Sequence, residues 1–405
     1  MDFLKSAVAS AIAKSSSLPF ILEGQVDVED SLWTLNNATR KSDNTACSVF
    51  SFDIAANNSR APLAKNAVRK LRTLRHPGVV KILDTVETES HIHVMTERVQ
   101  PLGWAVKRKS LSTETIIWGL HAVATTVKFI NEDAASIHGA IRMSSVYTSE
   151  SGEWRLWGFE VLSSVKDDES TIYTYGSLIP NYSTYAPPEV LKTGPDAIKG
   201  GPLTAVDSFG FGVLVFQVFN GGAFRGPSDV GKSSHIPSNI QPSYKRLMNA
   251  SPKLRLSVSH FLDQGKRLGG FFDSTIIKLT EDIDKLGLKS EEERDEFIST
   301  LDELSDGFPE DFFKIKVLPQ LLHSVEYGGG GPKVFGAIVK IGSKLSEEEY
   351  HSKVTPVVVR LFGNPDRAMR VSLLEHLPLM IDFLPKKIVN DKIFPQMVRI
   401  LSIIG

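Results

Sequence analysis

The 405-residue sequence predicts a multidomain fold, in which an α+β two-lobed region is followed by an all-α array of helical repeats. Three observations support this prediction. Short β-branched and aromatic runs separated by Asn, Asp and Ser turns fill residues 18–99, helical patterns dominate residues 100–262, and a Lys-x-x-Pro pattern recurs after residue 312. The length fits two or three domains.

Residues 1–17, MDFLKSAVASAIAKSSS, predict a separate N-terminal helix or tail. Apolar residues at helical spacing make this stretch weakly amphipathic, so it packs on the protein or frays, with a membrane foot as the alternative. It lacks a cationic start before a long apolar core, which excludes a secretory signal. No apolar run in the sequence is long enough for an integral membrane segment.

The first lobe, residues 18–99, predicts five strands and one helix. The helix is APLAKNAVRKLRTLRHPG after the third strand, because Leu63, Ala67, Leu71 and Leu74 recur on one face and Pro-Gly ends it. The single Cys47 excludes an internal disulfide and any Cys-based zinc site, and is most simply a small buried residue. The strands are predicted at 20–28, 31–40, 47–54, 79–88 and 91–97.

The second lobe, residues 100–262, predicts mainly helices, including 113–133 and 206–222. Residues 263–311 then predict a helical bridge, whose acidic stretch KSEEERDEFISTLDEL is a surface helix. The glycine run at 328–331 predicts a turn between helices. It is not a phosphate-binding loop, since no Lys-Ser/Thr pair follows it.

Residues 312–405 contain an internal repeat. Three stretches, KVLPQLLHSV, KVTPVVVRLF and KIFPQMVRIL, place Pro319, Pro356 and Pro395 at intervals of 37 and 39 residues, with a second helix between each pair. Two helices in about 40 residues are typical of HEAT and armadillo repeats, which stack into a solenoid. The chain stops in an apolar RILSIIG where a solenoid needs a polar cap, so we expect the array to be truncated there.

Residues 18–262 resemble a protein kinase domain, with 18–99 as its N-lobe and 100–262 as its C-lobe. The stretches RHPGVVKILD, YAPPEV, DSFGFG and SPKLRLS occur in the order of kinase landmarks. The resemblance implies a partly buried structural ion pair between Glu189 of YAPPEV and Arg255 of SPKLRLS.

The catalytic side chains of a kinase are replaced in this sequence. Phosphoryl transfer needs a phosphate-binding Lys, a Glu that orients it, an Asp base, and an Asp and an Asn that hold magnesium. The glycine-rich loop becomes DVEDSLWTLN, in which Trp33 and three acids oppose a nucleotide. We predict a pseudokinase without cofactor or metal, a working kinase being the alternative. Phe50 replaces the phosphate-binding Lys, Ala67 the orienting Glu and Ala140 the Asp base. Gly158 and Ser145 replace the Asp and the Asn that hold magnesium.

A degenerate pair of kinase lobes joined to helical repeats resembles the Scy-like pseudokinase family, particularly its fungal branch of cytoplasmic tRNA export factors. Stretches along nearly the whole chain carry the likeness, among them RTLRHPGVVKILDTVETE, VYTSESGEWRLWGFE, YKRLMNASPKLRLS and FFKIKVLPQLL. The resemblance implies a non-catalytic scaffold in nuclear tRNA export, in the cytoplasm or at the cytoplasmic face of nuclear pores. Implied partners are tRNA, export receptors, the nuclear pore, small GTPase machinery and a translation elongation factor.

The same resemblance offers an alternative function, an adaptor in COPI-dependent Golgi-to-ER vesicle traffic, with COPI coat subunits as partners. The basic tail that commonly serves this role does not occur in these 405 residues.

A net charge of −1 means that any affinity for nucleic acid must come from a local basic patch. Cations gather on the predicted helix near residues 61–78 and at 107–109. A solvated face that also carries acids is the simpler interpretation of most of them. The repeat helices supply a tentative surface for tRNA or another partner, made of Lys340, Lys344, Lys353, Arg360, Arg367, Arg370, Lys386 and Lys387.

Overall fold

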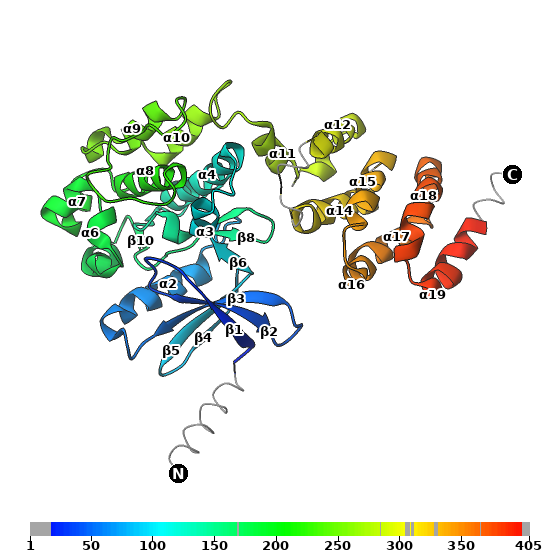
Figure 1. Cartoon of the computed structure of the whole chain (residues 1–405), viewed down its shortest axis with the longest axis horizontal. Helices are drawn as coiled ribbons and strands as arrows, with labels where there is room; N and C mark the ends of the chain where they lie inside the picture. The colour runs from blue at the N-terminus through cyan, green and yellow to red at the C-terminus, as the bar shows by residue number, and fades with distance from the viewer. Residues whose placement is uncertain are drawn as a thin grey trace, which may run out of the picture. The chain divides into compact units, whose positions relative to one another are not determined.

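The computed structural model describes residues 18–167, 170–283, 285–303, 308, 312–327, 331–364 and 366–398. They form two compact units, one made of residues up to 149 and 153–273, the other of residues from 274 onward together with residues 150–152 (Figure 1). The predicted N-terminal helix, most of the glycine run and the apolar C-terminal end lie outside the described residues. Within the described ranges, no helix combines the length and the apolar character needed to cross a membrane.

An antiparallel five-stranded sheet, in the order β1-β2-β3-β5-β4, builds the first lobe. Strand β4 starts later than the run that predicted it, because Val79 and Val80 turn aside and bridge to Leu156. The strands are β1 (Phe20–Val26), β2 (Thr34–Arg40), β3 (Ala46–Asp53), β4 (Ile82–Glu87) and β5 (His91–Thr96).

Helix α2 (Ala61–Thr73) follows β3 and packs beside the sheet against β4 (Figure 1). Pro62 lies in its first turn, where the missing N–H costs no hydrogen bond. Leu63, Ala67 and Leu71 lie on the buried face, as the spacing predicts. The helix ends where Leu74 becomes extended, with ψ at 118°.

The second lobe is mainly helical, and α8 (Ala205–Phe219) lies in its middle (Figure 1). This helix is apolar on nearly all sides, which fits its almost complete burial. Two small sheets, β6-β8-β9 and β7-β10, lie near the boundary between the lobes. Their strands are β6 (Val99–Pro101), β7 (Ser136–Ile137), β8 (Val146–Ser149), β9 (Trp154–Leu156) and β10 (Ser163–Ser164).

The other helices of this lobe surround α8 and carry the chain back and forth across it. Helix α4 begins where the Ser112 hydroxyl accepts the Thr115 N–H at 3.1 Å. The set comprises α3 (Leu102–Lys107), α4 (Thr113–Lys128), α5 (Thr171–Tyr175), α6 (Tyr182–Tyr185), α7 (Pro188–Thr193), α9 (Gln241–Leu247) and α10 (Val258–Gly265).

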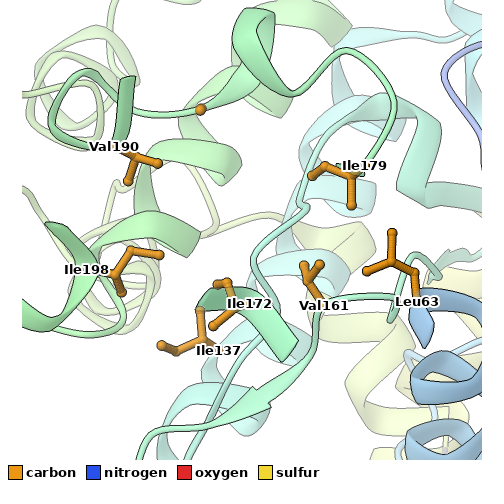
Figure 2. Close-up of a cluster of buried hydrophobic side chains, with 8 residues drawn as sticks. Leu63, Ile137, Val161, Ile172, Ile179, Val190 and Ile198 are labelled. Carbon is orange, nitrogen blue, oxygen red and sulfur yellow. The ribbon is translucent and has the colours of Figure 1, made fainter. Parts of the chain in front are cut away.

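A buried aliphatic cluster joins α2 to the segment that follows β9. Figure 2 shows Leu63 reaching from α2 toward Val161, with Ile172, Val190 and Ile198 further along the same cluster. Full burial of each such side chain stabilises the fold by about 1.5–3 kcal/mol. The cluster therefore fixes α2 to the second lobe.

The described residues of the second unit form helices joined by short turns. Helices α14 and α15 pack against each other, and α15 packs against α18. The unit contains α11 (Thr275–Ile283), α12 (Glu291–Glu303), α14 (Leu318–Tyr327), α15 (Pro332–Gly342), α16 (Glu347–Glu349), α17 (Thr355–Leu361), α18 (Arg367–Met380) and α19 (Lys386–Ile388).

A five-residue π-helical turn precedes each of the three repeat prolines. The N–H before each proline donates to the carbonyl five residues back, as from Thr355 to Tyr350. A proline has no N–H for the usual bond and its ring clashes with the carbonyl four residues back, so the chain widens there. The turns, at Phe313–Val317, Tyr350–Val354 and Val389–Ile393, start 37 and 39 residues apart like the prolines.

Candidate functional site

The chain between β1 and β2, where a kinase has its glycine-rich loop, is tied to the second lobe. Asp30 sits in the left-handed region with φ at 55°. Its carboxylate accepts the Tyr185 hydroxyl at 2.7 Å and the Asn181 side-chain amide, and its carbonyl accepts Arg142 Nη2 at 2.9 Å. These bonds hold the loop across the mouth of the cleft between the lobes.

Two further bonds fasten the same loop. Trp104 Nε1 donates to the carbonyl of Asp27 at 3.1 Å, and Lys107 Nζ lies 2.5 Å from the Glu29 carboxylate. The carboxylates of Glu29 and Asp30, two of the three acids predicted to repel phosphates, thus have partners within the protein, and Asp27 takes part through its backbone carbonyl.

Trp33 fills the cleft from above. Its side chain is buried, and its Nε1 donates to Glu160 Oε1 at 2.7 Å. Its ring meets Phe52 and Trp157 edge-on, with centroids 5.9 Å apart in each pair. The hydrogen bond joins residues 127 positions apart in the sequence. The loop therefore contributes a side chain to the core in place of backbone amides for a phosphate.

Phe50, the residue predicted to replace the phosphate-binding lysine, lies on β3. It is fully buried and stacks on Trp157 at 4.0 Å between centroids and 20° between planes. Tyr147 packs on it edge-on at 5.2 Å. Together with Trp33, these rings form a buried aromatic stack around Phe50 and Trp157. Ala67, at the position of the orienting glutamate, lies on the buried face of α2.

The space left at the catalytic positions is small. A cavity of about 20 Å³ remains, and Ala140, Ser145, Gly158 and Glu160 are among its lining residues. That volume admits about one water molecule. Across the described part of the chain, no group of three or more His, Cys, Asp and Glu side chains could hold a metal ion. A metal–triphosphate complex does not fit this cavity.

Gly158 adopts a conformation that disfavours the metal-binding aspartate of a kinase. Its φ is 86°, and a Cβ built on it would lie 2.9 Å from Ser145 Cβ. Ser145 in turn closes a local turn, since its hydroxyl donates to the Arg142 carbonyl at 2.7 Å and accepts the Arg142 N–H at 3.0 Å. Gly158 thus allows a left-handed backbone conformation, and Ser145 stabilises a turn by hydrogen bonds to the Arg142 backbone.

Asp207 and His138 hold the loop that would carry the catalytic base. The Asp207 carboxylate accepts the N–H groups of His138 and Gly139 and the side chain of Asn131, at 2.7–2.8 Å. Burial raises the pKa of Asp207 to about 6, and burial lowers the pKa of His138 to about 4. His138 is therefore neutral and donates its Nε2 proton to the Trp157 carbonyl at 2.9 Å.

Glu160 is the functional residue that sequence reasoning missed. The sequence predicted no role for it, whereas in the structure it joins three parts of the fold. Burial raises its pKa, and the Trp33 N–H and the Arg142 charge oppose that shift. Its carbonyl accepts Asn66 Nδ2 of α2 at 2.9 Å. A lone carboxylate in the apolar run WGFEVL was the available signal.

Arg255 and Glu189 lie together in the second lobe. Two parallel bonds of 2.7 and 2.8 Å join the guanidinium to the carboxylate, and the Arg255 side chain is fully buried. Arg255 also donates to the carbonyls of Ala205 at 2.8 Å and Asn249 at 2.9 Å. Each of the three guanidinium nitrogens thus donates a hydrogen bond, which makes the pair a structural joint.

The tentative surface on the repeat helices is partly neutralised by acids. Lys340 pairs with Asp302 at 2.8 Å. Lys353 pairs with Glu349 at 3.4 Å, and Arg360 also pairs with a carboxylate, that of Glu326. Arg370 donates to the carbonyl of Asn364 at 3.3 Å. Within the described ranges, no ion pair involves the other four cations, Lys344, Arg367, Lys386 and Lys387.

Comparison with known proteins agrees with this fold. The family of protein tyrosine and serine/threonine kinases matches residues 27–262. The probable inactive serine/threonine-protein kinase scy1 of Dictyostelium discoideum is 33% identical, over 96% of this chain and 47% of that protein. Cytoplasmic export protein 1 of Saccharomyces cerevisiae is 22% identical, over 97% of this chain and 51% of that protein.

A crystal structure of Cex1p has the same fold, with a TM-score of 0.59 and 17% identity over 95% of this chain and 77% of that one. The chain spans about half the length of the curated relatives described above.

A two-lobed kinase fold with an aromatic stack in its cleft defines a kinase-like protein. The chain belongs to the SCY1-like family of pseudokinases, as the resemblance predicted.

Proposed function

We propose that this protein is a catalytically inactive, kinase-like adaptor in nuclear tRNA export. In this proposal it works in the cytoplasm or at the cytoplasmic face of nuclear pores, and binds tRNA together with export receptors. The aromatic stack of Trp33, Phe50 and Trp157 supports the inactive assignment, because it places bulky apolar rings where the phosphate-binding lysine of a kinase is predicted. Similarity to a relative named Cytoplasmic export protein 1 supports the export role.

The helical second unit is proposed to be a HEAT-type solenoid that displays binding surfaces. The recurring proline and π turn support this proposal, because repeats of one supersecondary unit stack by the same contacts each time. Val317, Val354 and Ile393, the last residues of the three turns, are all buried and make equivalent contributions to the core.

Magnesium-ATP is expected to leave the melting temperature of the kinase-like unit (residues 18–273) unchanged. A ligand bound only by the folded state at 100 times its Kd would stabilise that state by about 2.7 kcal/mol. The measurement is differential scanning fluorimetry with millimolar nucleotide, beside an active kinase as a positive control. A reproducible rise of several degrees with nucleotide, absent with magnesium alone, would contradict the inactive assignment.

Fluorescently labelled tRNA is expected to bind the chain at low salt and to dissociate steeply as salt rises. Phosphate contacts release counterions, so the logarithm of the association constant falls linearly with the logarithm of salt concentration. Fluorescence anisotropy at four or more salt concentrations gives the slope. Absence of binding at the lowest salt would overturn the tRNA proposal. A pulldown that recovers COPI coat subunits without tRNA would instead favour the vesicle adaptor.

A further inference from the structure

The most basic stretch of the chain lies in the kinase-like unit. Residues 54–83 contain seven Lys and Arg residues and no Asp or Glu. By contrast, residues 274–405 contain 17 Lys and Arg against 21 Asp and Glu, so the repeat region is acidic overall. A polyanion would therefore meet a more favourable field at residues 54–83 than at the tentative surface on the repeats.

Helix α2 presents these cations on one side. Lys65, Arg69 and Arg72 are exposed along the face opposite its buried apolar residues, and Arg75 is exposed just beyond its end. We call the seven cations of this stretch the α2 basic face; they are Arg60, Lys65, Arg69, Lys70, Arg72, Arg75 and Lys81.

Neutral side chains accept hydrogen bonds from two guanidinium groups of this face. Arg69 Nη2 donates to Asn66 Oδ1 at 2.8 Å, and Arg72 Nε donates to Thr85 Oγ1 at 3.1 Å. Within the described residues, the ion pair of Lys65 with Glu87, at 3.5 Å, involves the basic face and no other pair does. These hydrogen bonds orient the cations and leave most of their charge uncompensated.

The basic face continues into a hollow at the C-terminal end of α2. The cavity measures about 260 Å³, and Arg75, Lys81 and Arg155 lie on its wall above an apolar floor. The one acid on that wall, Glu97, accepts the backbone N–H of Lys81 at 2.8 Å and lies 3.7 Å from Arg155 Nε. Arg155 also pairs with Glu153 at 2.8 Å, so Arg75 and Lys81 carry the positive charge of this wall.

We propose that the α2 basic face binds the sugar-phosphate backbone of RNA. This inference rests on the proposed function and assigns the tRNA contact to the kinase-like unit. Arginine forks match phosphate oxygens, and such contacts need no base sequence. The exposed side of α2 carries no apolar side chain. A protein partner would need an apolar interface core, and an amphipathic membrane helix would need an apolar face.

The anchoring of α2 suits this role. Asn66 donates to the carbonyls of Glu160 at 2.9 Å and Leu162 at 3.1 Å, and Leu63 lies in the aliphatic cluster of Figure 2. The helix that moves in many kinases is held here on its buried side. Its cations are thus presented in one arrangement, which reduces the entropy lost on binding.

The test compares two triple variants of the chain with the parent protein. Variant one, Arg69→Gln, Arg72→Gln and Arg75→Gln, neutralises the basic face. Variant two, Lys344→Gln, Arg367→Gln and Lys386→Gln, removes equal charge from the tentative repeat surface. We expect variant one to weaken labelled tRNA at least tenfold near physiological salt and to lower the salt slope by about 2–3. Variant two should bind as the parent does.

The outcomes separate this inference from the proposed function. If the parent binds tRNA and only variant two loses it, the surface assignment is wrong and the proposed function stands. If the parent binds no tRNA at all, the proposed function itself fails. If variant one still binds tRNA but no longer binds phosphatidylserine vesicles that the parent binds, the α2 basic face binds a membrane surface and the RNA assignment is overturned. The single variants Arg69→Gln and Arg72→Gln, each expected to lower the slope by about 1, keep the test valid if the triple unfolds.

Discussion

Replacement of Trp33 by alanine is expected to lower the free energy of unfolding of the kinase-like unit by about 3–5 kcal/mol. The indole is buried against Phe52 and Trp157, and its truncation leaves a cavity between the lobes. The same change removes the donor to the buried Glu160 carboxylate. Urea denaturation followed by far-UV circular dichroism measures the change without depending on the lost fluorophore.

Trp33→Phe is the matched control for this experiment. It keeps an aromatic ring in the cleft and removes the N–H donor, so we expect a smaller loss of about 1.5–3 kcal/mol, the usual range for a bond to a charged group. An alanine variant as stable as the parent would show that the side chain does not hold the lobes together. Equal losses in both variants would assign the whole effect to the Glu160 bond.

Arg255→Ala is expected to lower the free energy of unfolding by about 3–5 kcal/mol, because it leaves the Glu189 carboxylate without its partner. The guanidinium also binds the carbonyls of Ala205 and Asn249, and these acceptors would lose a charged donor. The measurement is the urea midpoint and slope of the parent and the variant, from which the unfolding free energies follow.

Arg246→Ala serves as the control, because Arg246 is an exposed arginine nine positions earlier in the same lobe. Surface changes of this kind usually alter stability by less than about 0.5 kcal/mol. A loss at Arg255 no larger than the loss at Arg246 would mean that the ion pair contributes little and that packing around α8 holds the segment.

The kinase-like fold was predictable because its signals are local and ordered. Strand runs, the single helix after the third strand and the landmark YAPPEV each depend on a few neighbouring residues. The late start of β4 was not predictable, since Val79 and Val80 read as strand residues and their actual partner is Leu156. The spacing of the repeat prolines was visible in the sequence, whereas the π turn before each one was not.

The contents of the cleft, like the start of β4, could be predicted from the sequence only in part. The replacement of kinase side chains, as at Phe50 and Gly158, is predicted from the sequence one position at a time. What fills the cleft depends on contacts across long separations, such as Trp33 to Glu160 and Asn66 to Leu162. The partners of the Glu29 and Asp30 carboxylates could not be predicted either, because Lys107 and Tyr185 lie far along the chain.

The loop that is hydrogen-bonded across the cleft affects how this protein can switch between states. The two lobes of a kinase close when nucleotide binds and open when it is released. Many molecular switches depend on such a cycle. A loop that is hydrogen-bonded to the second lobe, beside a cleft filled with aromatic rings, is not expected to open and close with nucleotide. In the proposed export role, capture and release of cargo would then depend on concentration, ionic strength and the energy that partner proteins consume, and those partners would set the direction of transport.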